Sequence, residues 1–221
     1  MLKQYEAESN LRTYFVVDSS SSMHLPLPNS KWNTLVQLLT LIGTLLQKQR
    51  DGMGLLEINE TGSHFFEAKA TSEWIKLMLS HLSKNDGETK KNANIAFEIE
   101  ALMAKIPRRS QVILFIDLFQ ENLEKILDAA ALLAFEGHSV RCSFISHAEL
   151  ELNEEYFAGK QVIDSETGTK VYLDQNDAKR YVSFVEAQKE YAITLGRNLN
   201  LNCKILDATR EPIYLLRELL A

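Results

Sequence analysis

Apolar runs bounded by turn residues alternate along this chain with stretches of helical period. Residues 11–17 and 111–117 predict two buried strands, and the second is apolar on both faces, which is typical of a central parallel strand. Residues 31–49 place leucine and isoleucine side chains on one broad face and predict a long buried helix. Further strands are predicted at 51–58, 63–68, 139–146 and 201–206, and further helices at about 72–82, 95–106, 121–135, 176–198 and 211–220.

This alternation predicts an α/β fold of the doubly wound, Rossmann type, in which a parallel sheet carries helices on both faces. Residues 160–174 depart from the alternation and predict a small hairpin insertion that turns at Glu166 to Thr169. The sequence contains no internal repeat, low-complexity tract or linker. Residues 1–221 are therefore expected to form a single domain with a sizeable core.

Composition argues against several classes of function. The 221 residues carry a net charge of −6, which does not favour a nucleic-acid-binding surface. No stretch approaches the roughly 20 apolar residues of a membrane span, and the polar N-terminus is unlike a secretory signal. Cys142 and Cys203 lack metal-ligand spacing and are expected to be small side chains within strands. The expected class is a cytoplasmic protein without a membrane span.

Polar residues gather where the two central strands end. Asp18 and four serines follow the first strand, and Asp117 ends the strand at 111–117. In doubly wound sheets, ligands bind at the carboxyl ends of the strands, where the strand order reverses. If these two strands are neighbours at that point, Asp18 and Asp117 share one edge with the serines.

The spacing of these residues suggests a cation site. Asp18, Ser20 and Ser22 form a D-x-S-x-S pattern, and with Asp117 they offer the hard oxygen ligands that Mg²⁺ accepts. Two hydroxyls and two carboxylates cannot complete an octahedron, so water or a carboxylate of another protein would fill it. The alternative is purely structural: a serine-rich loop that caps the following helix, with Asp18 merely ending its strand.

A hydrolase is the competing functional interpretation. His147 follows the strand at 139–146, so it could meet one of the serines and Asp117 at the same edge and form a triad. The sequence contains neither a G-x-S-x-G elbow nor a glycine-rich phosphate loop. Ester or phosphate turnover that is lost in Ser20→Ala would favour the enzyme.

Several blocks resemble known proteins. "DSSSSM" after an apolar strand resembles the metal-ion-dependent adhesion site of von Willebrand factor type A domains. "KQYEAESNLRTYFVVDSSSSM", "KIPRRSQVILFIDLF" and "DSETGTKVYLD" resemble, in the right order, the bacterial family called domain of unknown function fifty-eight. This resemblance implies a six-stranded, mostly parallel sheet with the first and fourth strands at the switch point.

The resemblance also implies a function. Members of the family are typically linked with MoxR-type AAA ATPases, so the chain is expected to be a non-enzymatic protein-interaction module. It would act as an adaptor that binds the ATPase, a client protein or both during the assembly or maturation of protein complexes. The edge that carries Asp18, Ser20, Ser22 and Asp117 is expected to be the docking site.

The chain departs from the family pattern at the site. Ala93 stands where the adhesion-site threonine is expected, so Asn92 or Asn94, or Thr89 from a displaced loop, would have to supply an oxygen. Alternatively, the ammonium group of Lys90 or Lys91 could lie where the cation would sit and neutralise both aspartates without metal.

Three further features of the sequence give expectations. Ile116 replaces the small polar residue that is usual before the second aspartate. The acidic stretch 149–155 is expected to be a solvated face or, as the alternative, a docking strip for a basic ATPase surface. Longer members of the family carry a further segment before "KQYE", so the chain is either a short member or a trimmed one.

Overall fold

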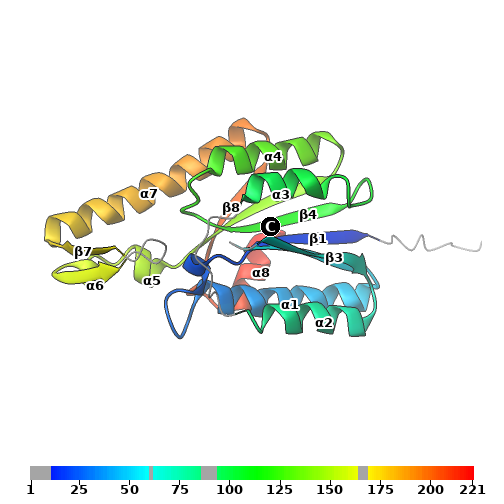
Figure 1. Ribbon diagram of the computed structural model, residues 1–221, viewed down its shortest axis with the longest axis horizontal. Helices are drawn as coiled ribbons and strands as arrows, with labels where there is room; N and C mark the ends of the chain where they lie inside the picture. The colour runs from blue at the N-terminus through cyan, green and yellow to red at the C-terminus, as the bar shows by residue number, and fades with distance from the viewer. Residues whose placement is uncertain (1–10, 60–61, 86–93, 164–168) are drawn as a thin grey trace, which may run out of the picture.

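A six-stranded sheet forms the centre of the computed structural model, which describes residues 11–59, 62–85, 94–163 and 169–221. The strand order is β3-β2-β1-β4-β5-β8, and only the β2–β3 pair is antiparallel (Figure 1). The predicted α/β fold is confirmed, and β1 and β4 are neighbours at the switch point. The strands are β1 (Arg12–Asp18), β2 (Gly52–Asn59), β3 (Gly62–Lys69), β4 (Gln111–Asp117), β5 (Ser139–Ser146) and β8 (Asn202–Asp207).

Helices cover both faces of this sheet (Figure 1). Along β1, Tyr14 and Val16 face one hydrophobic layer, whereas Phe15 and Val17 face the other, because successive side chains of a strand point to opposite faces. The first layer is covered by α3 (Ile95–Leu102), α4 (Leu123–Phe135) and α7 (Gln175–Asn198). The second layer is covered by α1 (Lys31–Gln49), α2 (Ser72–Leu82) and α8 (Pro212–Leu220).

The central strands are buried on both sides, as their continuous apolar pattern predicts. All four residues from Tyr14 to Val17 are fully buried, and Val112 to Ile116 are at most 5% exposed. Their carboxyl ends therefore emerge from a rigid, closely packed part of the molecule. This arrangement gives the side chains that follow β1 and β4 well-defined positions.

The helix boundaries follow local chemistry. Ser30 caps α1 by accepting a hydrogen bond from the Asn33 amide at 3.1 Å, and Arg50 ends the helix in the left-handed region with φ 59°. The prediction for 95–106 was too long, because α3 ends at Leu102 and the chain then turns ahead of Pro107. Three short helices were not predicted: η1 (Ser21–His24), α5 (Ala148–Glu151) and α6 (Glu154–Phe157).

The predicted hairpin insertion is confirmed by β6 (Lys160–Ile163) and β7 (Lys170–Leu173), which pair antiparallel. Its predicted turn lies largely outside the described residues. The hairpin and α6 lie at the N-terminal end of α7, beyond the main sheet (Figure 1). Within the described parts of the chain, no helix is long and apolar enough to cross a membrane.

Candidate functional site

The carboxyl ends of β1 and β4 bring the two predicted acids together. We call this place, with Asp18, Ser20, Ser22 and Asp117, the central rim. The backbone N–H of Asp117 donates to Oδ2 of Asp18 at 3.2 Å, although the two residues are 99 positions apart. The expectation that both acids share one edge of the sheet is therefore correct.

Both acids lie beneath the surface, which the sequence did not predict. Asp18 is fully buried and Asp117 is 1% exposed. Asp18 accepts hydrogen bonds from the Ser20 amide at 3.0 Å and from Nε2 of Gln120 at 2.6 Å. Burial raises the pKa of Asp18 to about 6, although the backbone donors at Ser20 and Asp117 favour the charged form.

The serine run is held by its own hydrogen bonds. The hydroxyl of Ser19 donates to the carbonyl of Ile58 at 3.2 Å, which ties the loop to β2. The hydroxyls of Ser20 and Ser22 form a hydrogen bond with each other at 3.2 Å. Fully buried Met23 then anchors η1 in the core. The D-x-S-x-S spacing therefore does gather Ser20 and Ser22 beside Asp18, as predicted.

A lysine that sequence reasoning missed brings a positive charge to this site. Nζ of Lys31 lies 2.9 Å from Oδ2 of Asp117 and 3.2 Å from Oε1 of Glu151, and Lys31 is 4% exposed. Burial opposes the ammonium form, but the two carboxylates outweigh it and raise the pKa of Lys31 above its ordinary range. Lys90 and Lys91, the predicted sources of such a charge, lie outside the described residues.

A signal for Lys31 was present in the sequence. It is the first residue of α1, where the helix dipole disfavours a positive charge, and it directly precedes buried Trp32. A lysine at the first position of a buried helix therefore needs a compensating carboxylate. The sequence does not say which carboxylate this is, because the partners lie 86 and 120 positions away.

The acidic stretch 149–155 is not simply a solvated face. Glu151 is 3% exposed, and its second carboxylate oxygen accepts from the His147 backbone N–H at 3.0 Å. Burial raises the pKa of Glu151, while the neighbouring Lys31 lowers it. The expectation fails for Glu151 because α5 turns this residue inward, whereas Glu149, Glu154 and Glu155 are exposed.

The central rim does not fit the expected Mg²⁺ or other divalent cation. Oδ2 of Asp117 already faces an ammonium group, and Oδ2 of Asp18 accepts from Gln120 and from a backbone N–H. The weaker candidate Asn94 uses its side-chain oxygen to cap α3, and Asn92 lies outside the described residues with Ala93 and Thr89. In the described ranges, no three His, Cys, Asp or Glu side chains are placed to hold a metal ion.

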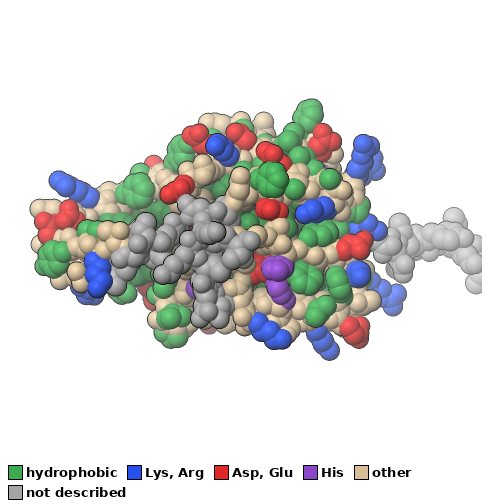
Figure 2. Space-filling view, viewed as in Figure 1, with side chains coloured by type: hydrophobic (Ala, Val, Ile, Leu, Met, Phe, Trp, Pro, Cys, Tyr) green, Lys and Arg blue, Asp and Glu red, His purple; other side chains and the backbone are tan. Residues whose placement is uncertain are grey.

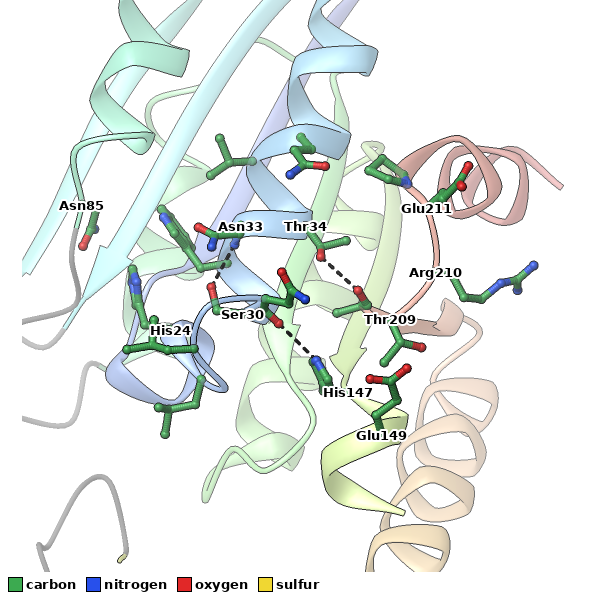
Figure 3. A pocket seen from close by; sticks show the side chains of 18 of the residues that line it. His24, Ser30, Asn33, Thr34, Asn85, His147, Glu149, Thr209, Arg210 and Glu211 are labelled. Atoms are coloured by element: carbon green, nitrogen blue, oxygen red, sulfur yellow. Dashed lines mark hydrogen bonds between the residues drawn. The ribbon is translucent and has the colours of Figure 1, made fainter. Parts of the chain in front are cut away.

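The hydrolase triad is not assembled in the structure. The ring of His147 is bonded through Nε2 to the backbone carbonyl of Asn29 at 3.1 Å, so it points toward the loop before α1 (Figure 3). It borders a cavity of about 890 Å³ with mixed polar and apolar walls, together with Ser30, Thr34 and Thr209 (Figure 3). Ser20 and Asp117 have other partners, so His147 forms no triad with these two residues.

A larger feature adjoins the central rim. A cavity of about 830 Å³ lies between the rim and the hairpin, and Ser22, Lys31, Asp117 and Glu151 line one side of it. The other walls are largely apolar and include Leu25, Phe119, Phe157, Val162, Val171 and Leu173. Charged side chains of both signs are interspersed over the described face that Figure 2 shows, without a patch of one sign.

Several solved structures are similar to this chain in fold. BatB from Bacteroides thetaiotaomicron matches with a TM-score of 0.58 at 12% identity, over 94% of this chain and 99% of that chain. The SpRpn10 VWA domain matches with 0.50 at 14% identity, over 95% and 93%. Manganese-loaded TRAP protein from Plasmodium vivax matches with 0.50 at 16% identity, over 82% and 74%.

At these identities the likeness shows the fold alone, which is that of von Willebrand factor type A domains. No curated protein sequence matches the chain. The sequence does match one family, over residues 1–192. The chain therefore belongs to the family described as "Protein of unknown function DUF58".

Proposed function

We propose that this chain is a non-enzymatic protein-interaction module, and that the cavity between the central rim and the hairpin is its docking site. The observation that carries the proposal is this cavity of about 830 Å³ with largely apolar walls at the switch point of the sheet. The fold of the chain supports it, because ligands of doubly wound sheets bind at the carboxyl ends of the strands, where the strand order reverses.

The chemistry of the cavity indicates what a partner brings. Lys31 is paired with both Asp117 and Glu151, so it balances only one of the two carboxylates and the trio keeps a net negative charge, which disfavours an acidic group. Exposed Tyr156 and Val171 stand at the hairpin side and are 44% and 48% exposed. We therefore expect the partner to insert an apolar side chain from an extended or helical segment, rather than an acidic one.

The proposed partner is a MoxR-type AAA ATPase. Its support is the membership of the chain in this family and the resemblance of the three sequence blocks to members that are linked with such ATPases. In this arrangement the ATPase supplies the energy, and the module couples it to a client protein. Asp18 and Ser20 would shape the docking edge from beneath, whereas Ser22 and Asp117 line the cavity that receives the partner.

A direct binding experiment tests both parts of the proposal. The purified chain is titrated with the MoxR-type ATPase of the same organism, and the double variant Tyr156→Ala/Val171→Ala is compared with wild type. We expect the double variant to bind at least roughly tenfold more weakly, because two apolar contacts are removed from the cavity wall. The matched control is Phe135→Ala, an 85% exposed aromatic residue at the end of α4, on the opposite edge of the sheet.

The outcomes separate the partner from the place. Equal affinity of the double variant and wild type would show that the ATPase docks elsewhere. Absence of binding by wild type would refute the ATPase as partner. Hydrolysis of an ester or phosphate that disappears in Ser20→Ala would instead establish the enzyme.

A further inference from the structure

Lys31 pairs with two carboxylates at the docking edge. Its Nζ bridges Oδ2 of Asp117, at the end of β4, and Oε1 of Glu151, in α5. All three side chains are at most 5% exposed. One positive charge thus joins three elements, α1, β4 and α5, at the point where the sequence predicts a cation.

The position of the ammonium group leaves no room for a divalent ion at Asp117. Mg²⁺ binds carboxylate oxygens at about 2.0–2.1 Å and demands near-ideal octahedral geometry. An ion at that distance from Oδ2 of Asp117 would share this oxygen with Nζ of Lys31, which lies only 2.9 Å from the same oxygen. Two cations so close together repel strongly in a buried setting, so one of them must leave.

The other oxygens of the site are also engaged. The second oxygen of Asp117 accepts from the Phe119 backbone N–H at 3.3 Å. Both oxygens of Asp18 accept from N–H groups, and the two site serines bond to each other. A metal ion would therefore have to displace several hydrogen bonds as well as Lys31.

We infer that Lys31 takes the place of a divalent cation in this chain, and that Glu151 occupies the position of an acidic ligand from outside. The central rim is then complete without metal and without a partner's carboxylate. Its work is to hold α1, β4 and α5 in one arrangement, which fixes one side of the cavity. The part of this inference that concerns docking rests on the proposed function: partner binding is independent of divalent cations.

Metal titration of the isolated chain tests the inference without any partner. MgCl₂ and MnCl₂ are titrated by calorimetry, and bound Mn²⁺ is followed by electron paramagnetic resonance. Wild type is expected to show no saturable uptake at millimolar metal, and its thermal midpoint is expected to be the same in EDTA and in MgCl₂. Lys31→Met, which keeps the length of the side chain but removes the charge, is expected to bind Mn²⁺ at least roughly tenfold more tightly than wild type.

Each result decides for or against the inference. Saturable uptake by wild type that is lost in Asp117→Asn would overturn it, as would Mn²⁺ binding by folded Lys31→Met that is no tighter than that of wild type. If circular dichroism shows that Lys31→Met is unfolded, the wild-type titration and its Asp117→Asn control decide alone. Binding of the nucleotide-free ATPase in EDTA that stays within about twofold of its value in MgCl₂ supports the docking half, and loss of that binding in EDTA overturns it.

The metal and partner experiments fail separately. Wild type that takes up metal still has its docking cavity, so the proposed function stands. If wild type binds neither metal nor the ATPase, the inference about Lys31 stands and only the proposed partner is refuted.

Discussion

The central rim and the hairpin border the same cavity, but they are built in opposite ways. The rim consists of buried charged and polar groups, and Lys31 reaches its partners across 86 and 120 positions of sequence. The hairpin is held by local pairing, in which Lys160 lies opposite Leu173, and it exposes Val171 and Tyr172 to the extent of 48% and 64%. One side of the cavity is thus set by tertiary packing and the other by a short local structure.

This difference separates stability from recognition. Breaking a buried ion pair leaves an uncompensated charge in a medium that solvates it poorly, so changes in the rim act mainly on folding. Exposed side chains on a hairpin bury little surface in the free protein, so changes there act mainly on binding. Loss of partner binding in a rim variant is therefore informative only with a stability measurement beside it.

The largest expected effect comes from removing the charge at the rim. Lys31→Met should lower the free energy of unfolding by about 3–5 kcal/mol at neutral pH, because Asp117 and Glu151 lose their shared counterion. Urea denaturation measures the change. The matched control is Lys48→Met, an exposed lysine in the last turn of the same helix, which should change stability by no more than about 0.5 kcal/mol. Similar costs for the two variants would contradict the buried bridge.

An intermediate effect is expected from pH at Asp18, whose pKa is raised from 3.8 to about 6 by burial. At pH values between these two pKa values, Asp18 keeps its proton in the folded chain but has released it in the unfolded chain. The resulting stabilisation is fully present below the unfolded pKa and is lost as the pH rises through about 6. From about pH 5 to about pH 7.5, this group alone should lower the free energy of unfolding by about 1 kcal/mol.

The difference between two proteins isolates this contribution. Wild type and Asp18→Asn are unfolded with urea at about pH 5 and about pH 7.5. The decrease in the free energy of unfolding between these pH values should be smaller in the variant. Asp128→Asn, which removes an exposed acid on α4, controls for the change in net charge. Equal pH dependence in wild type and Asp18→Asn would mean that Asp18 titrates alike in the folded and unfolded chains.

The smallest expected effect on stability lies on the hairpin side. Tyr172→Ala removes a side chain that is 64% exposed, so the free energy of unfolding should change by no more than about 0.5 kcal/mol. Chemical denaturation under the conditions used for Lys31→Met makes the comparison direct. A cost above about 1.5 kcal/mol would show that the hairpin packs as an integral part of the core, and the contrast with the rim would fail.

Much of the fold could be read from the sequence because its signals are local. The uninterrupted apolar runs of β1 and β4 indicated that both faces of these strands are buried, and turn residues marked where strands and helices end. The meeting of Asp18 with Asp117 followed from a topological rule for strand ends. The short helix α5 was not foreseen, because four residues are too few to show a helical period.

The site could be predicted only in part. The D-x-S-x-S spacing located the residues but suggested a metal, whereas the structure places Lys31 against Asp117. Gln120 and Glu151 were missed because neither belongs to a motif and both reach the rim through packing. The sequence also suggested that Lys90 or Lys91 neutralises the acids; these two residues lie outside the described residues, and the lysine that the structure places at Asp117 is Lys31.

The sequence by itself determined the alternation of strands and helices, the burial of the central strands and the gathering of acids and serines at their ends. These properties depend on neighbouring residues and on the periods of strand and helix. Tertiary structure alone decided which charge balances those acids and whether they reach solvent. A buried charge selects its partner by proximity in the packed molecule, so Lys31 and Glu151 could be recognised only once α1, β4 and α5 were in place.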